Sequence, residues 1–304
     1  MIIALSGGIG GAKLALGLSR VLSPEELLII ANTGDDFEHY GLTICPDTDT
    51  LLYTLAGLDN PQLGWGRADE SWAFMQTLAG LGGADWFRLG DRDLALHVLR
   101  SHRLRAGEAL SAITDDLRRR FGIGPRILPM SDDPVRTRIG TDQGWLDFQD
   151  WFVRLRAEPL ARAVQFAGVE KARAQPALLD ALQAKPRGIV LCPSNPFISI
   201  EPILALPGLR DAIKASGAPV VAVSPIIAGQ AVKGPTARMF EALGITPSAA
   251  AVAARYGDLL HGYVMEEGDD ADGIVPRVFH AETLMRNLDD KMNLARQVLA
   301  AIDA

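Results

Sequence analysis

The fold of this chain is decided by its opening residues, which read Met1-Ile2-Ile3-Ala4-Leu5-Ser6-Gly7-Gly8-Ile9-Gly10-Gly11-Ala12-Lys13. A short apolar run breaks into a glycine cluster, and leucines follow at helical spacing. This order predicts a β-strand, a tight turn and the start of a helix. Unpaired N–H groups and the positive end of the helix dipole meet at such a turn, which favours a bound phosphate. The first residues therefore predict a phosphate-binding turn.

Further apolar runs with turn residues after them indicate how this unit continues. They are Leu27–Ala31, Ile189–Cys192 and Val220–Val223. Helical patterns lie between them, at Asp49–Leu58, Ser71–Leu81, Arg92–Ser101 and Ala109–Phe121. Continuous apolar strands that alternate with helices indicate a parallel sheet covered on both faces. We therefore expect an α/β, Rossmann-like fold with ligands at the carboxyl ends of the strands.

The middle of the chain has a different pattern. Arg136–Ile139 and Trp145–Arg154 alternate apolar and polar residues around Gly144, which predicts antiparallel strands. We find no internal repeat and no low-complexity linker. The expected organisation is a single domain over residues 1–304, with a core of about residues 1–60 and 186–304 and an inserted α+β subdomain of about residues 61–185.

Composition limits the class of protein. Hydrophobic residues make up 48% and charged residues 22% of the chain, which is typical of a globular protein. A net charge of −7 without a basic stripe argues against nucleic acid as a partner. Cys45 and Cys192 are far apart and have no metal-ligand spacing, so we expect reduced thiols. No run is long enough to cross a bilayer, and we expect a cytoplasmic protein without a membrane partner.

The glycine turn matches neither common phosphate-binding template. A P-loop requires Gly-Lys followed by Ser or Thr, whereas Lys13 stands between Ala12 and Leu14. A dinucleotide fingerprint would require glycine at position 13. A plain strand-to-helix turn is the alternative interpretation. We favour nucleotide contact because the small residues and the lysine exceed what a turn requires, and the candidate residues are Gly7, Gly8, Gly10, Gly11 and Lys13.

Four aspartates follow the second apolar run closely. Asp35 and Asp36 come directly after that strand, and Asp47 and Asp49 introduce the next helix. Carboxylates clustered beside a phosphate are typical ligands of Mg²⁺, so all four are candidate metal ligands. The alternative is that Asp49 is only the N-cap of its helix.

Two later motifs supply further polar residues that are candidates for contacting a ligand. Asp91-Arg92-Asp93 opens a helix, and an arginine held between two acids is suited to gripping an anion, although His97 in the next turn is typical of a structural histidine. Ser194-Asn195 follows a buried strand, where Asn195 is placed to contact a base or a ribose.

Taken together, these motifs resemble the 2-phospho-L-lactate transferase family of deazaflavin coenzyme biosynthesis. The matching segments follow the family's order over nearly the whole chain: Ser6–Gly11, Asn32–Asp36, Cys45–Thr50, Leu89–Asp93, Pro129–Asp133, Pro193–Pro196 and Ser224–Ile227.

The resemblance implies a magnesium-dependent transfer of a phospho-acid from a guanosine diphosphate-type donor to Fo, with release of GMP, in coenzyme F-420 biosynthesis. Fo is a deazariboflavin whose ribityl chain ends in a primary hydroxyl. The family's pattern places Asp49, Asp91 and Arg92 at Fo, and the glycine turn with Ser194 and Asn195 at the guanosine nucleotide. The catalytic candidates are Asp47, Asp49 and Arg92. The expected partners are these small-molecule substrates, and a second copy of the chain in a homodimer.

The sequence leaves the donor acid and two rival functions as alternatives. The acid of the donor is phospholactate, phosphoenolpyruvate or phosphoglycerate, and Gln230 and Lys233 are candidates for contacting it. The rival hypothesis is a non-catalytic regulator that binds nucleotide sugars, from a related bacterial family with a similar glycine turn. A dinucleotide-dependent oxidoreductase is disfavoured because its fingerprint fails at Lys13.

Overall fold

A seven-stranded parallel sheet forms the centre of the protein, in a computed structural model that describes residues 1–231 and 236–304. The strands lie in the order β14-β13-β10-β9-β1-β2-β5, and every pairing is parallel. Their bounds are β1 (Ile2–Ser6), β2 (Leu27–Ala31), β5 (Arg126–Pro129), β9 (Gly188–Leu191), β10 (Val220–Val223), β13 (Gly262–Glu266) and β14 (Arg277–Ala281).

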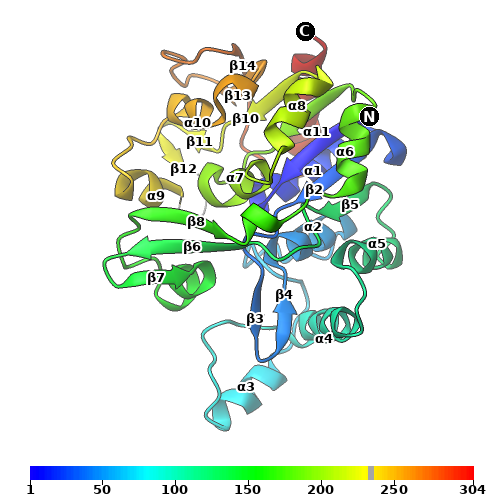
Figure 1. Ribbon diagram of the computed structural model, residues 1–304, viewed down its shortest axis with the longest axis vertical. Coiled ribbons are helices and arrows are strands. Elements are labelled where there is room, and N and C mark those ends of the chain that lie inside the picture. Colours follow the sequence, from blue (N-terminus) through cyan, green and yellow to red (C-terminus); the bar gives the residue numbers. More distant parts are fainter. Residues whose placement is uncertain (232–235) are drawn as a thin grey trace.

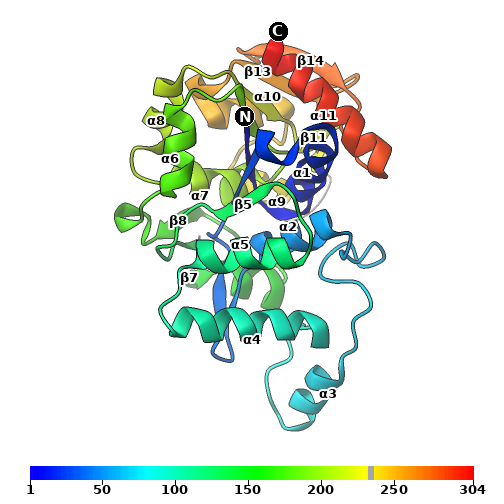
Figure 2. The ribbon, with the colours of Figure 1, turned by 90° about the vertical axis from the view of Figure 1, so that its right-hand side faces the viewer.

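Helices cover both faces of this sheet, as the two perpendicular views show (Figures 1 and 2). The helices are α1 (Gly8–Val21), α2 (Pro46–Ala56), α3 (Ala73–Gly80), α4 (Asp91–Arg105), α5 (Leu110–Arg120), α6 (Pro176–Gln183), α7 (Glu201–Leu204), α8 (Leu209–Ser216), α9 (Thr236–Ala242), α10 (Ala249–Tyr256) and α11 (Leu288–Asp303). Short 3₁₀ or π turns lie at Pro24–Glu26, Asp150–Arg154, Val169–Lys171, Pro196–Ile200 and Gly257–Leu259.

The core has two apolar layers, one on each face of the sheet. Ile3 and Leu5 of β1 join the layer under α6, α8 and α10, whereas Ile2 and Ala4 join the layer under α1, α2 and α11. Strands buried on both faces read as continuous apolar runs, which is why the sequence identified β1, β2, β9 and β10. The predicted α/β class with a parallel sheet covered by helices is confirmed.

Smaller antiparallel sheets extend from this core. One contains β6 (Arg136–Thr141) between β7 (Gly144–Asp147) and β8 (Ala163–Ala167), and another is the hairpin of β3 (Phe37–His39) and β4 (Leu42–Ile44). A third pairs β11 (Ile226–Ile227) with β12 (Gln230–Ala231). The α3 region projects at the end of the molecule opposite the C-terminus (Figure 1).

The middle of the chain differs from the expectation in two respects. β5 lies within residues 61–185 but pairs with β2, so one strand of the main sheet belongs to the segment that was expected to be an insertion. The predicted strand over Trp145–Arg154 ends at Asp147, and Asp150–Arg154 is a π turn. Trp151 is buried there and donates to the carbonyl of Pro159 at 2.7 Å, a tertiary contact that pattern reading could not supply. No helix in the described ranges is both long and apolar enough to cross a bilayer.

Candidate active site

A cavity of about 740 Å³ lies at the carboxyl ends of the central strands. Each turn that follows one of these strands contributes to its wall: Gly7 after β1, Asp35 after β2, Ser194 after β9 and Ser224 after β10. Turns far apart in the sequence therefore meet at one edge of the sheet, which is where α/β proteins bind ligands.

The glycine turn forms the start of α1 beside this cavity. Gly7 is the N-cap residue in an extended conformation, and Gly8 has a φ of +60°, which glycine adopts without strain. A Cβ on Gly10 would lie 2.2 Å from the carbonyl oxygen of Pro193, and one on Gly11 would lie 2.5 Å from Ser6 Oγ. Gly7, Gly8 and Gly10 line the cavity, whereas Gly11 does not. Close packing on the backbone of Pro193 thus explains Gly10, and close packing on the side chains of Ser6 and Ser194 explains Gly11.

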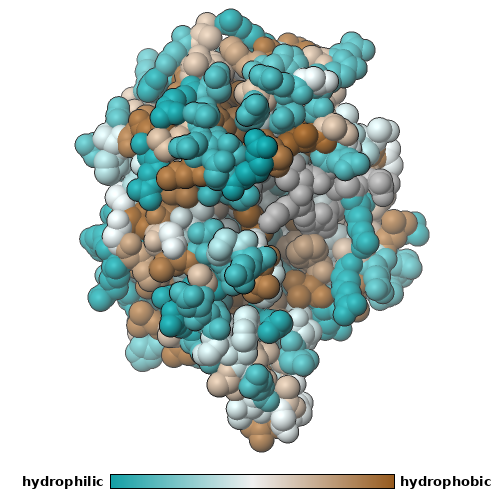
Figure 3. Space-filling view, turned by 180° about the vertical axis from the view of Figure 1, so that it is seen from behind, coloured by the Kyte–Doolittle hydropathy of each residue, from teal (hydrophilic) through white to brown (hydrophobic). Residues whose placement is uncertain are grey.

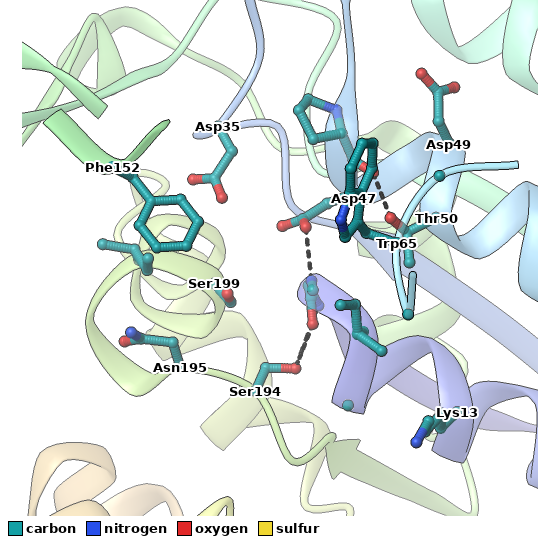
Figure 4. A pocket seen from close by; sticks show the side chains of 18 of the residues that line it. Lys13, Asp35, Asp47, Asp49, Thr50, Trp65, Phe152, Ser194, Asn195 and Ser199 are labelled. Atoms are coloured by element: carbon teal, nitrogen blue, oxygen red, sulfur yellow. Dashed lines mark hydrogen bonds between the residues drawn. The ribbon is translucent and has the colours of Figure 1, made fainter. Parts of the chain in front are cut away.

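The other predicted nucleotide residues surround this turn. Lys13 lines the cavity, and its Nζ donates to the carbonyl of Met285 at 2.9 Å. Ser194 Oγ donates to the carbonyl of Gly7 at 2.6 Å and thereby joins the β9 turn to the start of α1 (Figure 4). Asn195 also lines the cavity, but its Oδ1 accepts from the N–H of Phe197 at 2.8 Å, so that oxygen caps the next helical turn. Gln230 lies in β12, and Lys233 lies outside the described residues.

Asp35 and Asp47 are the acids that point toward one another in the cavity (Figure 4). Asp47 accepts from the N–H of Gly8 at 2.6 Å and from Asn32 Nδ2 at 2.8 Å. Burial raises the pKa of Asp47 to about 6. Burial and the charges of Asp47 and Asp36 raise the pKa of Asp35 well above its usual range. Two mutually repelling buried carboxylates at one wall are a natural place for a cation.

The other two candidate metal ligands are placed differently. Asp36 is buried but does not line the cavity, and burial raises its pKa to about 7. Asp49 lines the cavity, but both of its carboxylate oxygens accept hydrogen bonds from Arg100 (3.0 Å to Oδ2). In Figure 4 its carboxylate points away from Asp35 and Asp47. Asp49 is not an N-cap, because Cys45 has that position in α2.

A buried polar network extends from Asp49 into α4. His97 Nδ1 lies 3.7 Å from Asp49 Oδ2, and His97 Nε2 lies 3.2 Å from Asp93 Oδ2. The hydroxyl of Tyr53 donates to Asp93 Oδ1 at 2.5 Å. Asp49, Tyr53, Asp93 and His97 all line the cavity. The network thus fixes acidic side chains along a second wall.

Asp91 and Arg92 lie outside the cavity walls. Asp91 accepts from Ser71 Oγ at 2.5 Å and from two N–H groups at the start of α3, and these bonds, led by the one from Ser71, lower its pKa. The N–H of Arg92 donates to Glu70 Oε2 at 2.7 Å, and the arginine that lines the cavity is Arg88. The roles assigned to Asp91 and Arg92 stay predictions, but the structure does not bring them together with Asp49.

Aromatic side chains make up much of the remaining wall. Trp65, Trp86, Phe87, Phe148 and Phe152 line the cavity, and Phe148 and Phe152 are stacked with centroids 5.4 Å apart. Figure 4 shows the rings of Phe152 and Trp65 at the cavity that also holds Asp35 and Asp47. Seen from behind, brown apolar side chains lie across the middle of the molecule, above the narrow α3 lobe (Figure 3). An apolar wall of this kind is suited to a ligand with a flat ring.

The sequence pattern did not identify Arg100, marked Asp93 only as an acid flanking Arg92, and favoured a structural role for His97. Their spacing was the available signal, because residues three, four and seven apart share one face of a helix. His97 and Arg100 are both about 1% exposed, which no local pattern predicts for such polar side chains.

Whether Mg²⁺ fits this site can be tested on the buried oxygen atoms. Asp35 Oδ1 is buried and has no hydrogen-bond partner in the described ranges. It shares the cavity with the Asp47 carboxylate, and hard carboxylate oxygens are the donors that Mg²⁺ prefers. Asp35 and Asp47 therefore fit the ion, whereas Asp49 is already paired with Arg100.

Comparison with known proteins gives the same family over nearly the whole chain. The family model described as 2-phospho-L-lactate transferase CofD matches residues 2–297. A relative from Kitasatospora aureofaciens, named phosphoenolpyruvate transferase, is 44% identical, with 98% of this chain and 97% of that protein covered. Proteins with the same name from Thermobifida fusca (42%, with 99% and 97% covered) and Mycobacterium sp. strain KMS (39%, with 90% of each covered) are also similar.

Solved structures support the fold alone. A Bacillus halodurans protein, BH3568, aligns with a TM-score of 0.65 at 15% identity, over 100% of this chain and 99% of that one. A second structure, titled as a member of the UPF0052 family, gives a TM-score of 0.65 at 14% identity, with 98% of each chain covered. The family model and the relatives decide the assignment: this chain is a transferase of the 2-phospho-L-lactate transferase CofD family.

Proposed function

We propose that this transferase moves a phospho-acid from a guanosine diphosphate-type donor to the terminal ribityl hydroxyl of Fo. The hydroxyl oxygen attacks the phosphorus that bears the acid, and the bond from that phosphorus to GMP breaks. The hydroxyl loses its proton to a carboxylate of the cavity, GMP leaves with the oxygen of the broken bond, and a phosphodiester remains on Fo. Phosphoenolpyruvate is the acid that we favour, because the relatives that are 39–44% identical carry that name.

The observation that carries this proposal is the meeting of the α1 N-terminus with the buried acids of the same cavity. The N–H of Gly8 reaches Asp47 at 2.6 Å, so the amide end of a helix and a carboxylate are held side by side. Phosphoryl transfer requires positioning and charge neutralisation more than a covalent nucleophile. The first role suits the glycine turn, and the second suits a cation bound by the carboxylates.

Asp35 and Asp47 would hold a magnesium ion that neutralises charge on the donor phosphates. Two observations support this assignment: Asp35 Oδ1 is buried without a hydrogen-bond partner among the described residues, and the carboxylates of Asp35 and Asp47 repel one another. The apolar wall with Trp65 and Phe152 suits the flat deazaflavin ring of Fo, and Asp49 on the neighbouring wall suits a hydroxyl of its ribityl chain.

The test supplies the purified protein with Mg²⁺, Fo and one of three guanylylated acids, carrying lactate, enolpyruvate or glycerate phosphate. Mass spectrometry should detect one new phosphodiester on Fo together with GMP, and the enolpyruvate donor should react fastest. EDTA should stop turnover. Asp35→Asn should lose turnover, whereas the same change at exposed Asp142 should leave it intact.

Two results would contradict this proposal. Full activity in EDTA would remove the metal from the proposal. Absence of product with every donor, combined with tight binding of a nucleotide sugar, would favour a non-catalytic regulator.

A further inference from the structure

Arg100 is a buried cation with a specific partner on the cavity wall. It lies in α4 with about 1% of its surface exposed. Nη1 donates to Asp49 Oδ2 at 3.0 Å, and Nη2 donates to Asp49 Oδ1. Paired hydrogen bonds of this kind fix the orientation of a carboxylate as well as its charge. The carboxylate of Asp49 is therefore held in one position at the cavity.

A second set of contacts ties Arg100 to its surroundings. Nη1 also lies 3.4 Å from the carbonyl oxygen of Thr43, and the N–H of Thr43 donates to Ser101 Oγ at 2.7 Å. β4, α2 and α4 thus meet around one guanidinium. β4 and α2 are consecutive in the chain, whereas α4 begins only at Asp91. The contacts of Arg100 therefore fix the position of α4 relative to β4 and α2 at the cavity.

The stability of the fold does not by itself explain a buried ion pair. Removing two charges from water is costly, and well-packed apolar residues often stabilise a protein as much or more. Arg103, three residues further along α4, forms its ion pairs with Glu108 and Asp116 closer to the surface. The buried pair is the one whose acid faces the cavity.

A metal ion is the other occupant to consider beside Asp49. The side chains of Asp49, Asp93 and His97 offer ligand atoms within 4.8 Å of one another. However, the Arg100 guanidinium already contacts both oxygens of Asp49 and supplies the positive charge there. A second cation would have to displace or repel it, so the arrangement favours an internal counter-ion over a metal site.

We propose that Arg100 is a positioning residue that orients Asp49 toward the acceptor. This inference rests on the proposed function, in which Asp49 contacts the hydroxyl-bearing acceptor. Asp47, not Asp49, holds the N–H of Gly8 on the donor side. Loss of Arg100 should therefore disturb the acceptor and spare the donor nucleotide.

A double-mutant cycle tests this role. Arg100→Gln should lower kcat/KM for the acceptor about 100-fold, the size of loss that a misplaced reacting group produces. Arg100→Lys should recover part of it, because an ammonium keeps the charge but not the paired geometry. In an Asp49→Asn background, Arg100→Gln should cost little more, since residues that act through one another are not additive. Calorimetry should give the same affinity for GDP in every variant.

The control and the refuting outcomes separate this inference from the proposed function. Arg103→Gln removes an arginine from the same helix away from the cavity and should keep acceptor kcat/KM. Arg100→Lys keeps a positive charge beside Asp49, so it tests the positioning role through acceptor kcat/KM and GDP affinity if Arg100→Gln alone folds poorly. Additive losses, or a loss of GDP affinity with the acceptor KM unchanged, would overturn the positioning role. Failure of the unmodified protein to act on the acceptor would instead overturn the proposed function.

Discussion

At the scale of single residues, the acids after β2 are held where an isolated carboxylate is unfavourable. Asp35 and Asp36 each keep one buried oxygen without a hydrogen-bond donor among the described residues. A protein that ionises such groups gives up stability, and it does so most often where function requires the charge.

The stability cost of ionising Asp36 can be measured from the pH dependence of the melting temperature. Burial raises its pKa from 3.8 to about 7, so its contribution to stability is complete below pH 3.8 and is lost as the pH rises through 7. We expect the melting temperature of the protein in EDTA to rise as the pH is lowered from about 8 to about 5.5. Asp36→Asn should have a higher melting temperature than the unmodified protein at the upper pH and a flatter profile.

Asp142→Asn is the control for that experiment, because its exposed carboxylate should leave the profile unchanged. Some slope should persist in Asp36→Asn, since burial also raises the pKa of Asp47 to about 6. An Asp36→Asn profile that is parallel to the unmodified one would show that Asp36 ionises normally in the fold.

The same residues show how far a sequence predicts a site. Asp35 and Asp47 were identified because strand ends and helix starts are local signals, and parallel strands bring their carboxyl ends together. Arg100 was not, because its pairing with Asp49 depends on how α4 packs on α2, which no local pattern records.

At the scale of elements, α1 and α11 pack with almost no space between their backbones at Gly17. A Cβ at this position would lie 2.1 Å from the carbonyl oxygen of Lys291 and 3.3 Å from Ala295 Cβ. Backbone atoms cannot move aside as the end of a flexible side chain can. The glycine thus allows the first and last helices to touch.

Gly17→Ala should therefore destabilise the protein even though alanine favours a helix. Relief of the overlap should cost about 1–3 kcal/mol, more than the ~1 kcal/mol gained in helix propensity. Urea unfolding measures the difference. Gly80→Ala in α3 is the matched change, with nothing within 4 Å of the new Cβ, and it should be neutral or stabilising. Equal stability of the two variants would show that α1 and α11 can separate without penalty.

Elements were predicted unevenly for a physical reason. The central strands β1, β2, β9 and β10 are apolar on both faces, and their bounds were predicted within one residue. β5, β13 and β14 lie toward the sheet edges, and each has a charged residue at one end of the strand: Arg126, Glu266 and Arg277. Such strands depend on their neighbours for pairing, and sequence alone did not separate them from loops.

At the scale of the whole molecule, ligands should distinguish the competing functions through the melting temperature. A ligand that binds only the folded state adds about 2.7 kcal/mol at a hundredfold excess over its Kd. GDP with Mg²⁺ and, separately, Fo should raise the melting temperature, whereas a UDP-sugar and NAD should not. Differential scanning fluorimetry makes this comparison in one series. Stabilisation by the UDP-sugar alone would point to the regulator.

The strand order also has a consequence for how the protein is made. β1 is the first strand of the chain, yet it lies between β2 and β9, and β9 begins only at Gly188. The bond from Ser194 to Gly7 closes across 187 residues. During synthesis the edge of β1 that pairs with β9 therefore stays unpaired until most of the polypeptide has left the ribosome. This delay exposes the edge to wrong partners and slows folding. We therefore expect the cavity, which is built from turns on both sides of this gap, to be among the last parts of the molecule to form.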